Sequence, residues 1–453
     1  MKKTLSWACA LCLGAASLAG CAADDSTMAP APATEAGKDA KGGANDASNS
    51  DATRDAVAGK TPARLLVTVN DSKSSELVAI DLATGKVDGS LSFSGSLGTS
   101  YAYDQPYPFL LEQKSDVVAR LDSTRPWKVD ASWNVTLTDG VDGGYPYTDP
   151  VAAIVGGGGK AYVLRYDRNE IAVIDTTSSD GGELGTIDLS SLVQKNDADG
   201  IVEMTAGMYV AGKNRLYVVL ENIDEDAVSA DGEFLYCVDT VSTIVGIDTT
   251  TDAIVSLGGT GPQGSIALKG YNPVPGGFVY DKAGDRILLF EEGCYAMPTS
   301  DAGDAGAGPR SKGGVEAVSL NDFASTILLD ISSDFAPGLG YPSGIAFADE
   351  ADHTHAVLGF DFTGSEVYRW DTTSPKLGAS LVPNAPDVFV SDGAGHLLGT
   401  VTAETDAGSS TKVVSVEIAT GTSKTLNDGH ELFSMPGGFI GGVDIWPQPS
   451  PSL

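Results

Sequence analysis

The stretch from Lys160 to Ser190, KAYVLRYDRNEIAVIDTTSSDGGELGTIDLS, contains the clearest copy of a unit that recurs along most of the chain. An alternating apolar run, Ala161 to Tyr166, is followed by a polar corner, a second run ending in Ile174-Asp175, a Ser/Gly turn and a third run. Alternating apolar and polar residues in short runs between turn residues are typical of antiparallel strands. The stretch therefore predicts three consecutive strands.

Seven copies of this unit are found, and we call their first two runs strands b and c. The pairs are RLLVTVN with ELVAIDLATG, PFLLEQK with VVARLDS, KAYVLRY with EIAVIDTT, RLYVVLEN with STIVGIDTTT, RILLFEE with GVEAVSLND, HAVLGFD with EVYRWDTT, and HLLGTVT with KVVSVEIATG. Strand c ends at Asp81, Asp122, Asp175, Asp248, Asn321, Asp371 and near Ile418. These positions recur at or above the period of about 40 to 50 residues that four-stranded propeller blades show.

A short apolar run precedes each copy except the first and predicts an inner strand a. A spare run, Gly438 to Trp446, stands at the other end of the chain. If this run completes the first blade, the ring closes and no sheet edge stays open. The sequence therefore predicts an all-β fold, a seven-bladed β-propeller of four-stranded antiparallel blades over residues 63–447, with a short tail at 448–453.

Segments such as YPSGIAFADEADHTHAVLGFDFTGSEVYRWDTT resemble the YVTN/YncE (lactonase-like) group of β-propellers, in which a Pro-x-Gly corner and a strand ending in Ile-Asp-Thr recur. The resemblance covers roughly residues 64 to 446. It implies a fold whose members include binding proteins, scaffolds and some enzymes, so function has to be argued from a site.

Residues 1–20 have the build of a secretory signal peptide, with Lys2-Lys3 before an apolar stretch from Leu5 to Leu18. The ending Leu18-Ala19-Gly20-Cys21 resembles a bacterial lipoprotein lipobox, which implies that Cys21 carries lipid, palmitate included, and anchors the chain in the cell envelope. Ala22 after this cysteine implies that the lipidated protein is sorted to the outer membrane, where it faces the periplasm or the cell surface. The alternative is an ordinary signal peptide with a chance cysteine.

Residues 21–62 contain no aromatic residue and are rich in Ala, Asp, Ser, Gly and Thr. Such a segment buries too little apolar surface to offset the entropy of ordering, so we expect a disordered tether. The formal net charge of −33 excludes nucleic acid and an anionic bilayer surface as partners, because these require clustered basic residues. Membrane association is expected through the lipid alone.

Two of the five cysteines, Cys237 and Cys294, remain after the signal peptide and Cys21 are set aside. They lie in enlarged connections between strands b and c of the fourth and fifth copies. Since such connections emerge on one face of a propeller around the channel mouth, a disulfide between them is predicted. Two separate buried thiols are the alternative.

Tyrosines precede several inner strands and are expected to ring the channel mouth, where rigid aromatic side chains could contact a ligand. The candidates are Tyr103, Tyr107, Tyr147, Tyr271 and Tyr341. The alternative is that they pack against the next blade while neighbouring Pro and Gly residues fix the turn.

No catalytic constellation is visible: GxSxG and Walker motifs are absent from the sequence, no Cys-x-x-Cys pair follows the signal peptide, and no metal ligands are assigned. The acidic residues Asp224, Glu225, Asp226, Asp231 and Glu233 could supply oxygens to calcium, although a solvated acidic loop explains them equally. His353 and His355 could bind a metal from one face of a strand, but they are expected in a surface turn on the face opposite the channel mouth.

The sequence thus predicts a lipid-anchored envelope propeller that binds an envelope or extracellular protein, or a small ligand, through its loop-rich channel-mouth face. A lactonase or hydrolase acting on a small molecule is the alternative. A passive structural surface protein is a third possibility.

Overall fold

The computed structural model describes residues 63–446, except for 71–73, 94–96, 100–106, 137–146, 179–180, 225–226, 230–233, 298–308, 336–338, 350–351, 362–365, 375, 379, 384–387, 406–407 and 427–438. All described residues belong to one compact unit, Pro62–Leu453. The signal peptide, Cys21, the tether, Tyr103 and the C-terminal tail at 448–453 lie outside the described residues.

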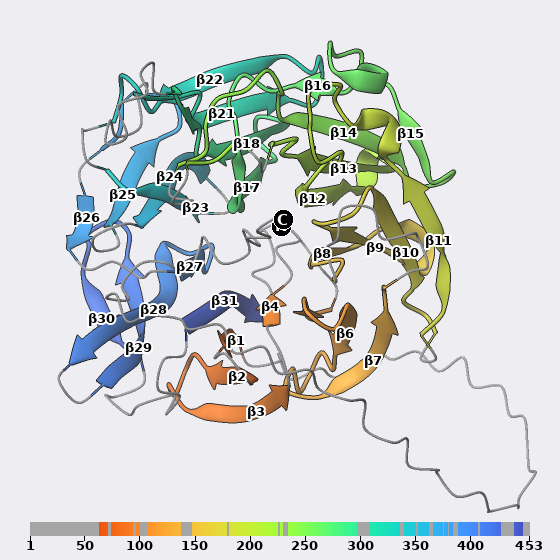
Figure 1. The fold of residues 1–453 in the computed structure, drawn as a ribbon. Coiled ribbons are helices and arrows are strands. Elements are labelled where there is room, and N and C mark those ends of the chain that lie inside the picture. The colour runs from red at the N-terminus through yellow and green to blue at the C-terminus, as the bar shows by residue number, and fades with distance from the viewer. Residues whose placement is uncertain are drawn as a thin grey trace, which may run out of the picture. The chain divides into compact units, whose positions relative to one another are not determined.

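The described chain forms seven antiparallel sheets arranged around a common axis (Figure 1). Each sheet has four strands in sequence order from the inner to the outer edge, and the first sheet takes its inner strand from the C-terminus. The predicted seven-bladed propeller of four-stranded blades is therefore confirmed.

Blades 1 to 4 contain the following strands from the inside outward. Blade 1 has β31 (Phe439–Trp446), β1 (Arg64–Asn70), β2 (Ser75–Asp81) and β3 (Val87–Phe93). Blade 2 has β4 (Leu97–Thr99), β5 (Phe109–Glu112), β6 (Val117–Leu121) and β7 (Val129–Asn134). Blade 3 has β8 (Pro150–Val155), β9 (Lys160–Arg165), β10 (Glu170–Asp175) and β11 (Glu183–Asp188). Blade 4 has β12 (Met204–Val210), β13 (Arg215–Leu220), β14 (Thr243–Asp248) and β15 (Ala253–Val255), and β16 (Ile266–Ala267) also pairs with β14.

Blades 5 to 7 follow the same order. Blade 5 has β17 (Pro273–Asp281), β18 (Arg286–Glu291), β21 (Gly314–Ser319) and β22 (Ser325–Asp330). Blade 6 has β23 (Tyr341–Asp349), β24 (Asp352–Asp361), β25 (Glu366–Asp371) and β26 (Ser380–Pro383). Blade 7 has β27 (Val388–Ser391), β28 (His396–Thr405), β29 (Gly408–Glu417) and β30 (Ser423–Thr425). A separate two-stranded ribbon, β19 (Cys294–Tyr295) with β20 (Arg310–Ser311), lies between β18 and β21 in the chain.

Ring closure occurs as the sequence predicts. β31 pairs antiparallel with β1 from Arg64↔Trp446 to Asn70↔Phe439, with one register shift between Thr68 and Val69. The two ends of the propeller are thereby joined by main-chain hydrogen bonds, and blade 1 has no unpaired inner edge.

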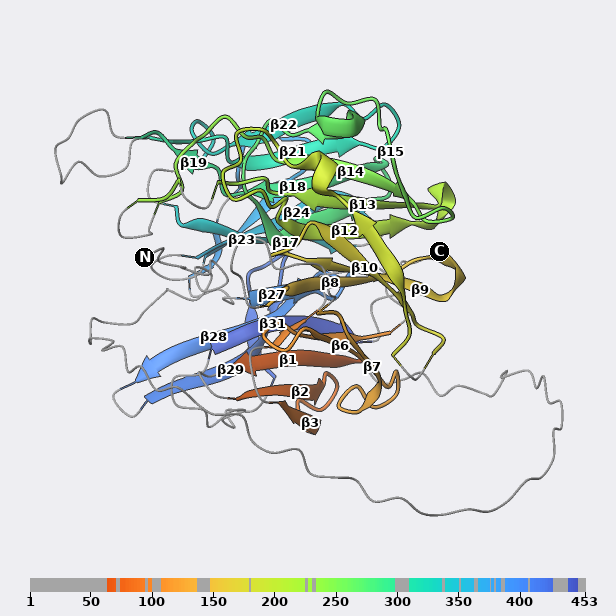
Figure 2. The same cartoon turned by 45° about the vertical axis from the view of Figure 1, so that its right-hand side comes forward.

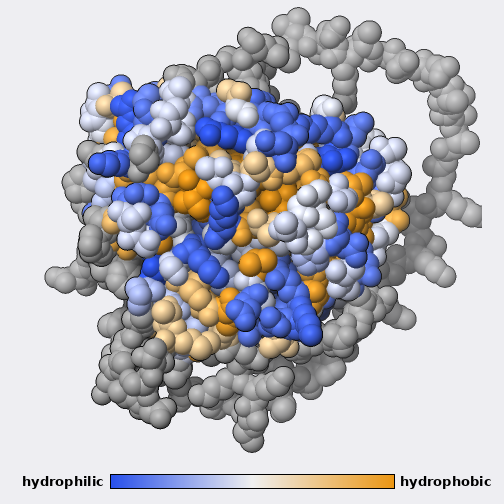
Figure 3. Space-filling model, turned by 90° about the horizontal axis from the view of Figure 1, so that it is seen from above, coloured by the Kyte–Doolittle hydropathy of each residue, from blue (hydrophilic) through white to orange (hydrophobic). Residues whose placement is uncertain are grey.

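Burial follows the position of a strand in its blade. Every residue of β1 is buried, whereas β3 and β7 alternate between exposed and more buried residues because one side of an outer strand faces solvent. Viewed from above, hydrophilic and hydrophobic groups are interspersed on the surface (Figure 3). Apolar side chains of neighbouring blades form shared clusters, as Ile154 and Leu164 of blade 3 do with Leu216 and Val218 of blade 4. The core therefore lies between the blades.

The recurring Asp at the end of strand c has a local structural role. Its Oδ1 accepts a hydrogen bond from a backbone N–H in the following turn, which satisfies a donor that the strand ladder leaves unpaired. These pairs are Thr84 to Asp81, Thr124 to Asp122, Thr177 to Asp175, Thr250 to Asp248, and Thr373 to Asp371, at 2.7–2.9 Å. The Asp-Thr pattern therefore marks the turn between strands c and d.

His353 corrects one sequence-based expectation. It is 7% exposed and lies in β24, where its ring stacks on Phe347 with a centroid distance of 4.1 Å. Its Nδ1 lies 2.9 Å from Asp281 Oδ1 of blade 5. The expected surface turn was wrong here because β24 begins at Asp352, which brings His353 into the contact between blades 5 and 6.

None of the helices among the described residues is long and apolar enough to cross a membrane.

Candidate functional site

The connections from strand b to strand c and from strand d to the next strand a lie on one side of the propeller, which we call the mouth face. The ribbon β19–β20 belongs to the b–c connection of blade 5, and β28 and β29 extend to the same side (Figure 2). The turns between a and b and between c and d form the opposite face. The enlarged connections of blades 4 and 5 therefore make the mouth face the more elaborate one.

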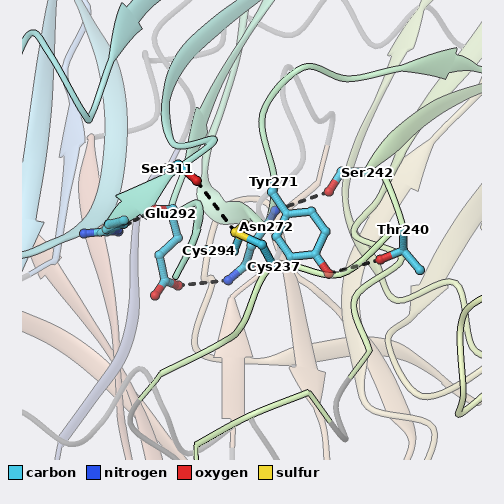
Figure 4. The surroundings of a disulfide bond; sticks show 9 residues. Cys237, Thr240, Ser242, Tyr271, Asn272, Glu292, Cys294 and Ser311 are labelled. Carbon is cyan, nitrogen blue, oxygen red and sulfur yellow. Dashed lines mark hydrogen bonds between the residues drawn. A yellow bond between two sulfur atoms is a disulfide. The ribbon is translucent and has the colours of Figure 1, made fainter. Parts of the chain in front are cut away.

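A disulfide joins these two connections. Cys237 and Cys294, separated by 57 residues, are bonded with their Cα atoms 4.9 Å apart, as the sequence predicts (Figure 4). The backbone reinforces the link, because Cys237 N–H donates to Tyr295 O at 2.9 Å and Tyr295 N–H donates to Leu235 O at 2.8 Å. The connections of blades 4 and 5 are thus held together as one surface element.

Tyr271 and Asn272 form hydrogen bonds with residues of both connections. Tyr271 is fully buried, and its hydroxyl lies 3.1 Å from Thr240 Oγ1. The backbone N–H of Asn272 donates to Ser242 Oγ at 3.2 Å, and its Nδ2 donates to Glu292 Oε2 at 3.0 Å (Figure 4). Burial of Tyr271 supports the packing role that the sequence left open.

Glu292, Arg310 and two tyrosines form a polar aromatic group beside the disulfide. Arg310 Nε donates to Glu292 O at 2.7 Å, and the guanidinium carbon lies 4.9 Å from the ring centroid of Tyr341 and 5.8 Å from that of Tyr295. Burial raises the pKa of Glu292 to about 7, although the Arg310 charge opposes the shift. Burial also raises the pKa of Tyr341, and the hydrogen bond with Tyr295 raises it further by a smaller amount. A carboxyl that titrates near neutrality next to Arg and Tyr can exchange a proton with a bound molecule.

The predicted tyrosines have different environments. Tyr147 is 41% exposed, and Met297 in the blade 5 connection is 54% exposed. Tyr107 is half-buried, with the Arg120 guanidinium 4.9 Å from its ring centroid. The structure therefore brings Tyr341 to the Glu292 group, keeps Tyr147 at the surface and leaves Tyr271 no surface for a ligand.

Raised carboxyl pKa values recur along the mouth face. Burial and the Asp116 charge raise the pKa of Asp149 to about 7 between blades 2 and 3. Burial and the Glu316 charge raise the pKa of Glu291 well above its ordinary value. Glu316 also accepts hydrogen bonds from the backbone N–H groups of Lys269 and Gly270, at 2.9 and 2.8 Å.

Sequence reasoning missed a carboxyl group cluster in the connection from blade 3 to blade 4. Asp197, Asp199 and Glu203 each place an oxygen within 4.8 Å of the others. The Asp-Ala-Asp-Gly spacing at 197–200 was the available signal. Of the acidic residues suggested from sequence, only Asp224 lies among the described residues, and it is not part of this cluster.

Two pockets lie away from this group. One of about 370 Å³ lies between blades 7 and 1 and is lined by His396 and Ile445 among others. The other, about 640 Å³, lies on the opposite face and is lined by Tyr209, Lys213 and Tyr280 among others. Neither of these two pockets is lined by Glu292 or Arg310.

No protein-family model matches this chain, and no curated protein matches it. Solved structures do resemble it. A hypothetical selenium-binding protein from Sulfolobus tokodaii has a TM-score of 0.52 and 11% identity, over 85% of this chain and 94% of that one. A 6-phosphogluconolactonase-like protein from Bacteroides fragilis has a TM-score of 0.48 and 12% identity, over 86% and 99%. The propeller domain of Cps50 (Swd1) from Myceliophteria thermophila has a TM-score of 0.47 and 12% identity, over 80% and 99%. At these identities the likeness concerns the fold alone.

Proposed function

We propose that this protein is a binding module that presents its mouth face to an envelope or extracellular protein. The observation that carries the proposal is the disulfide between Cys237 and Cys294, because it fixes two long connections of neighbouring blades as one surface. Fixing loops before binding reduces the entropy that association costs. Exposed Tyr147 and Met297 on the same face supply apolar contact area.

Chemical crosslinking in the source cells followed by affinity capture tests this proposal. We expect one protein partner to be captured with the intact chain and lost with the double variant Tyr147→Ser, Met297→Ser. Leu184→Ser is the matched control, because Leu184 is 56% exposed but lies in the outer strand β11. Equal capture by all three chains, or capture lost only with Leu184→Ser, would contradict the proposal.

We also propose that the domain is anchored through lipid on Cys21, so that the mouth face works at the outer membrane. The support is the lipobox-like ending Leu18-Ala19-Gly20-Cys21. Labelling cells with a clickable palmitate analogue should mark the wild-type chain and not the Cys21→Ser variant. Equal labelling, or recovery of the wild type only in the soluble fraction, would overturn the anchor.

A hydrolase acting on a small molecule such as a lactone is the second candidate, and Glu292 is the observation that favours it. With a pKa near 7 and Tyr341 nearby, Glu292 could take a proton from an attacking water. If so, turnover of a lactone panel should rise with pH through about 7 and disappear in Glu292→Gln. Turnover that Glu292→Gln retains in full would remove this candidate.

A further inference from the structure

The carboxyl group cluster of Asp197, Asp199 and Glu203 lies in the loop that joins β11 of blade 3 to β12 of blade 4. Three carboxylate oxygens within 4.8 Å of one another carry up to three negative charges in a small volume. Such an arrangement is unfavourable unless a proton or a cation reduces the repulsion. We call these three residues the acidic loop site.

One oxygen of this site has no protein partner. Asp197 is 9% exposed, and its Oδ2 is buried without a hydrogen-bond donor. Its Oδ1 accepts a long contact from Gly200 N–H, at 3.4 Å. A buried carboxylate oxygen without a donor costs stability, and a bound cation removes that cost.

The loop holds its carboxyl groups in fixed positions. Asn169, just before β10, donates from Nδ2 to Gly200 O at 2.8 Å and accepts from Val202 N–H at 3.0 Å. Glu203 is 2% exposed, and its Oε2 accepts from Ile223 N–H at 3.1 Å. These contacts come from elements on both sides of the loop, so the acidic loop site is formed before any ion arrives.

The loop is also connected to the disulfide-linked surface. Val241 N–H donates to Gln194 Oε1 at 3.0 Å, and Gln194 Nε2 donates to Val241 O. Val241 follows Thr240, whose hydroxyl contacts Tyr271. An ion bound in the acidic loop site would therefore stabilise the end of the blade 4 connection, near Val241.

We propose that Asp197, Asp199 and Glu203 bind a calcium ion. Carboxylate oxygens are the preferred ligands of calcium, which lies about 2.3–2.6 Å from each and accepts irregular geometry. Two oxygens on opposite sides of such an ion are about 5 Å apart, so three oxygens that all lie within 4.8 Å of one another can reach the same calcium ion. Magnesium needs oxygens at about 2.0–2.1 Å in near-ideal octahedral geometry, which ligands from one irregular loop supply less readily than they supply the flexible geometry of calcium. Backbone carbonyls or water would complete the coordination.

Calcium titration of the purified, chelator-treated chain tests the proposal. Isothermal titration calorimetry should show one calcium ion bound, and about 1 mM calcium should raise the thermal midpoint by about 2–5 °C, with little effect of magnesium. Asp197→Asn and Glu203→Gln should each reduce calcium affinity at least about tenfold. Asp239→Asn, which changes an exposed aspartate on the same face, is the control and should bind calcium like the wild type.

Asp197→Asn separates a metal site from a purely structural cluster. Without metal it should raise the thermal midpoint, because it removes one charge from a repulsive group, and it should abolish the calcium-dependent rise. If the wild type shows no calcium-dependent heat or midpoint shift, or if Asp197→Asn and Glu203→Gln both keep the wild-type affinity, the proposal is wrong.

Discussion

Carboxyl groups on the two faces of the propeller have pKa values shifted in opposite directions. On the opposite face, the turn aspartates accept hydrogen bonds from the side chains and backbone N–H groups of the threonines that follow them, and these bonds lower the pKa of Asp175, Asp248 and Asp371. On the mouth face, burial raises the pKa of Asp149, Asp197 and Glu292 to about 7. Asp188, at the end of β11, is an exception on the mouth face, because Ser190 lowers its pKa.

This difference separates a face whose carboxylates are stabilised by hydrogen bonds from a face whose carboxyl groups are desolvated. Short turns of the opposite face place donors beside each carboxylate and add contacts between blades, such as Lys160 with Asp252 and Lys213 with Asp285. Longer connections of the mouth face bring carboxyl groups together without enough donors, and a disulfide holds the connections in place. Raised carboxyl pKa values are typical of functional sites, since such groups gain from a ligand or proton.

The largest expected effect is that of the disulfide on the mouth face. The double variant Cys237→Ala, Cys294→Ala should lower the free energy of unfolding by about 2–4 kcal/mol, because the 57-residue loop is no longer closed in the unfolded chain. Urea unfolding without reductant measures this. Ser311→Ala, which removes a hydroxyl 3.7 Å from Cys237 Sγ, is the control and should change little. A double variant as stable as the wild type would mean that the loops hold each other without the disulfide.

The buried contact on the opposite face should come next. Asp281→Asn weakens the hydrogen bonds from His353 and Arg286, at 2.9 and 2.7 Å, and should cost about 2 kcal/mol at pH 7. Burial is the largest influence and raises the Asp281 pKa, but bonds from His353, Gly284 and Arg286 outweigh it and lower the pKa to about 2. Since the folded pKa lies below the unfolded one, this stabilisation is present above about pH 4 and is lost as pH falls toward 2. Urea midpoints of both chains from pH 7 to pH 2.5 should converge, and a constant difference would contradict the assignment.

Glu292 should have the opposite dependence on pH. Its raised folded pKa means that the folded state binds more protons than the unfolded state between about pH 4.5 and 7, so wild-type stability declines as pH rises through this range. Glu292→Gln removes this loss while it keeps an oxygen for Asn272 Nδ2. We expect equal stability near pH 5 and a gain of about 1 kcal/mol for the variant at pH 8. A variant less stable than the wild type at pH 8 would show that the ionised carboxylate is well solvated.

The smallest effect is expected for an exposed turn aspartate. Asp371→Asn keeps an acceptor for the Thr373 N–H and should leave the thermal midpoint close to that of the wild type at pH 7. The variant should also lose less stability than the wild type as pH falls below about 4, because the lowered pKa of Asp371 no longer contributes. Calorimetric scans at pH 7 and pH 3 measure both quantities. A large loss at pH 7 would mean that the turn contributes more than its exposure implies.

Much of the fold could be predicted because the information is local. Alternation of apolar residues defines strands b and c, and the Asp-Thr pair after strand c supplies its own turn hydrogen bonds, as at Asp175 and Thr177. The unpaired first strand and the spare run at the C-terminus predicted the closure between β1 and β31. Placement of Cys237 and Cys294 followed from the blade repeat, since equivalent connections lie on the same face.

The candidate site was predicted only in part, because it depends on contacts between segments far apart in the chain. Tyr271 and Tyr341 occur in similar sequence contexts, yet Tyr271 is buried against Thr240 while Tyr341 lies beside Arg310. Burial of His353 depends on Asp281, which is 72 residues away in the neighbouring blade. The sequence by itself determined the number of blades, their closure and the face on which the long connections lie, because these follow from short-range periodicity. Only the tertiary structure decided which carboxyl groups lack hydrogen-bond donors, because desolvation and neighbouring charges depend on distances that the chain order does not contain.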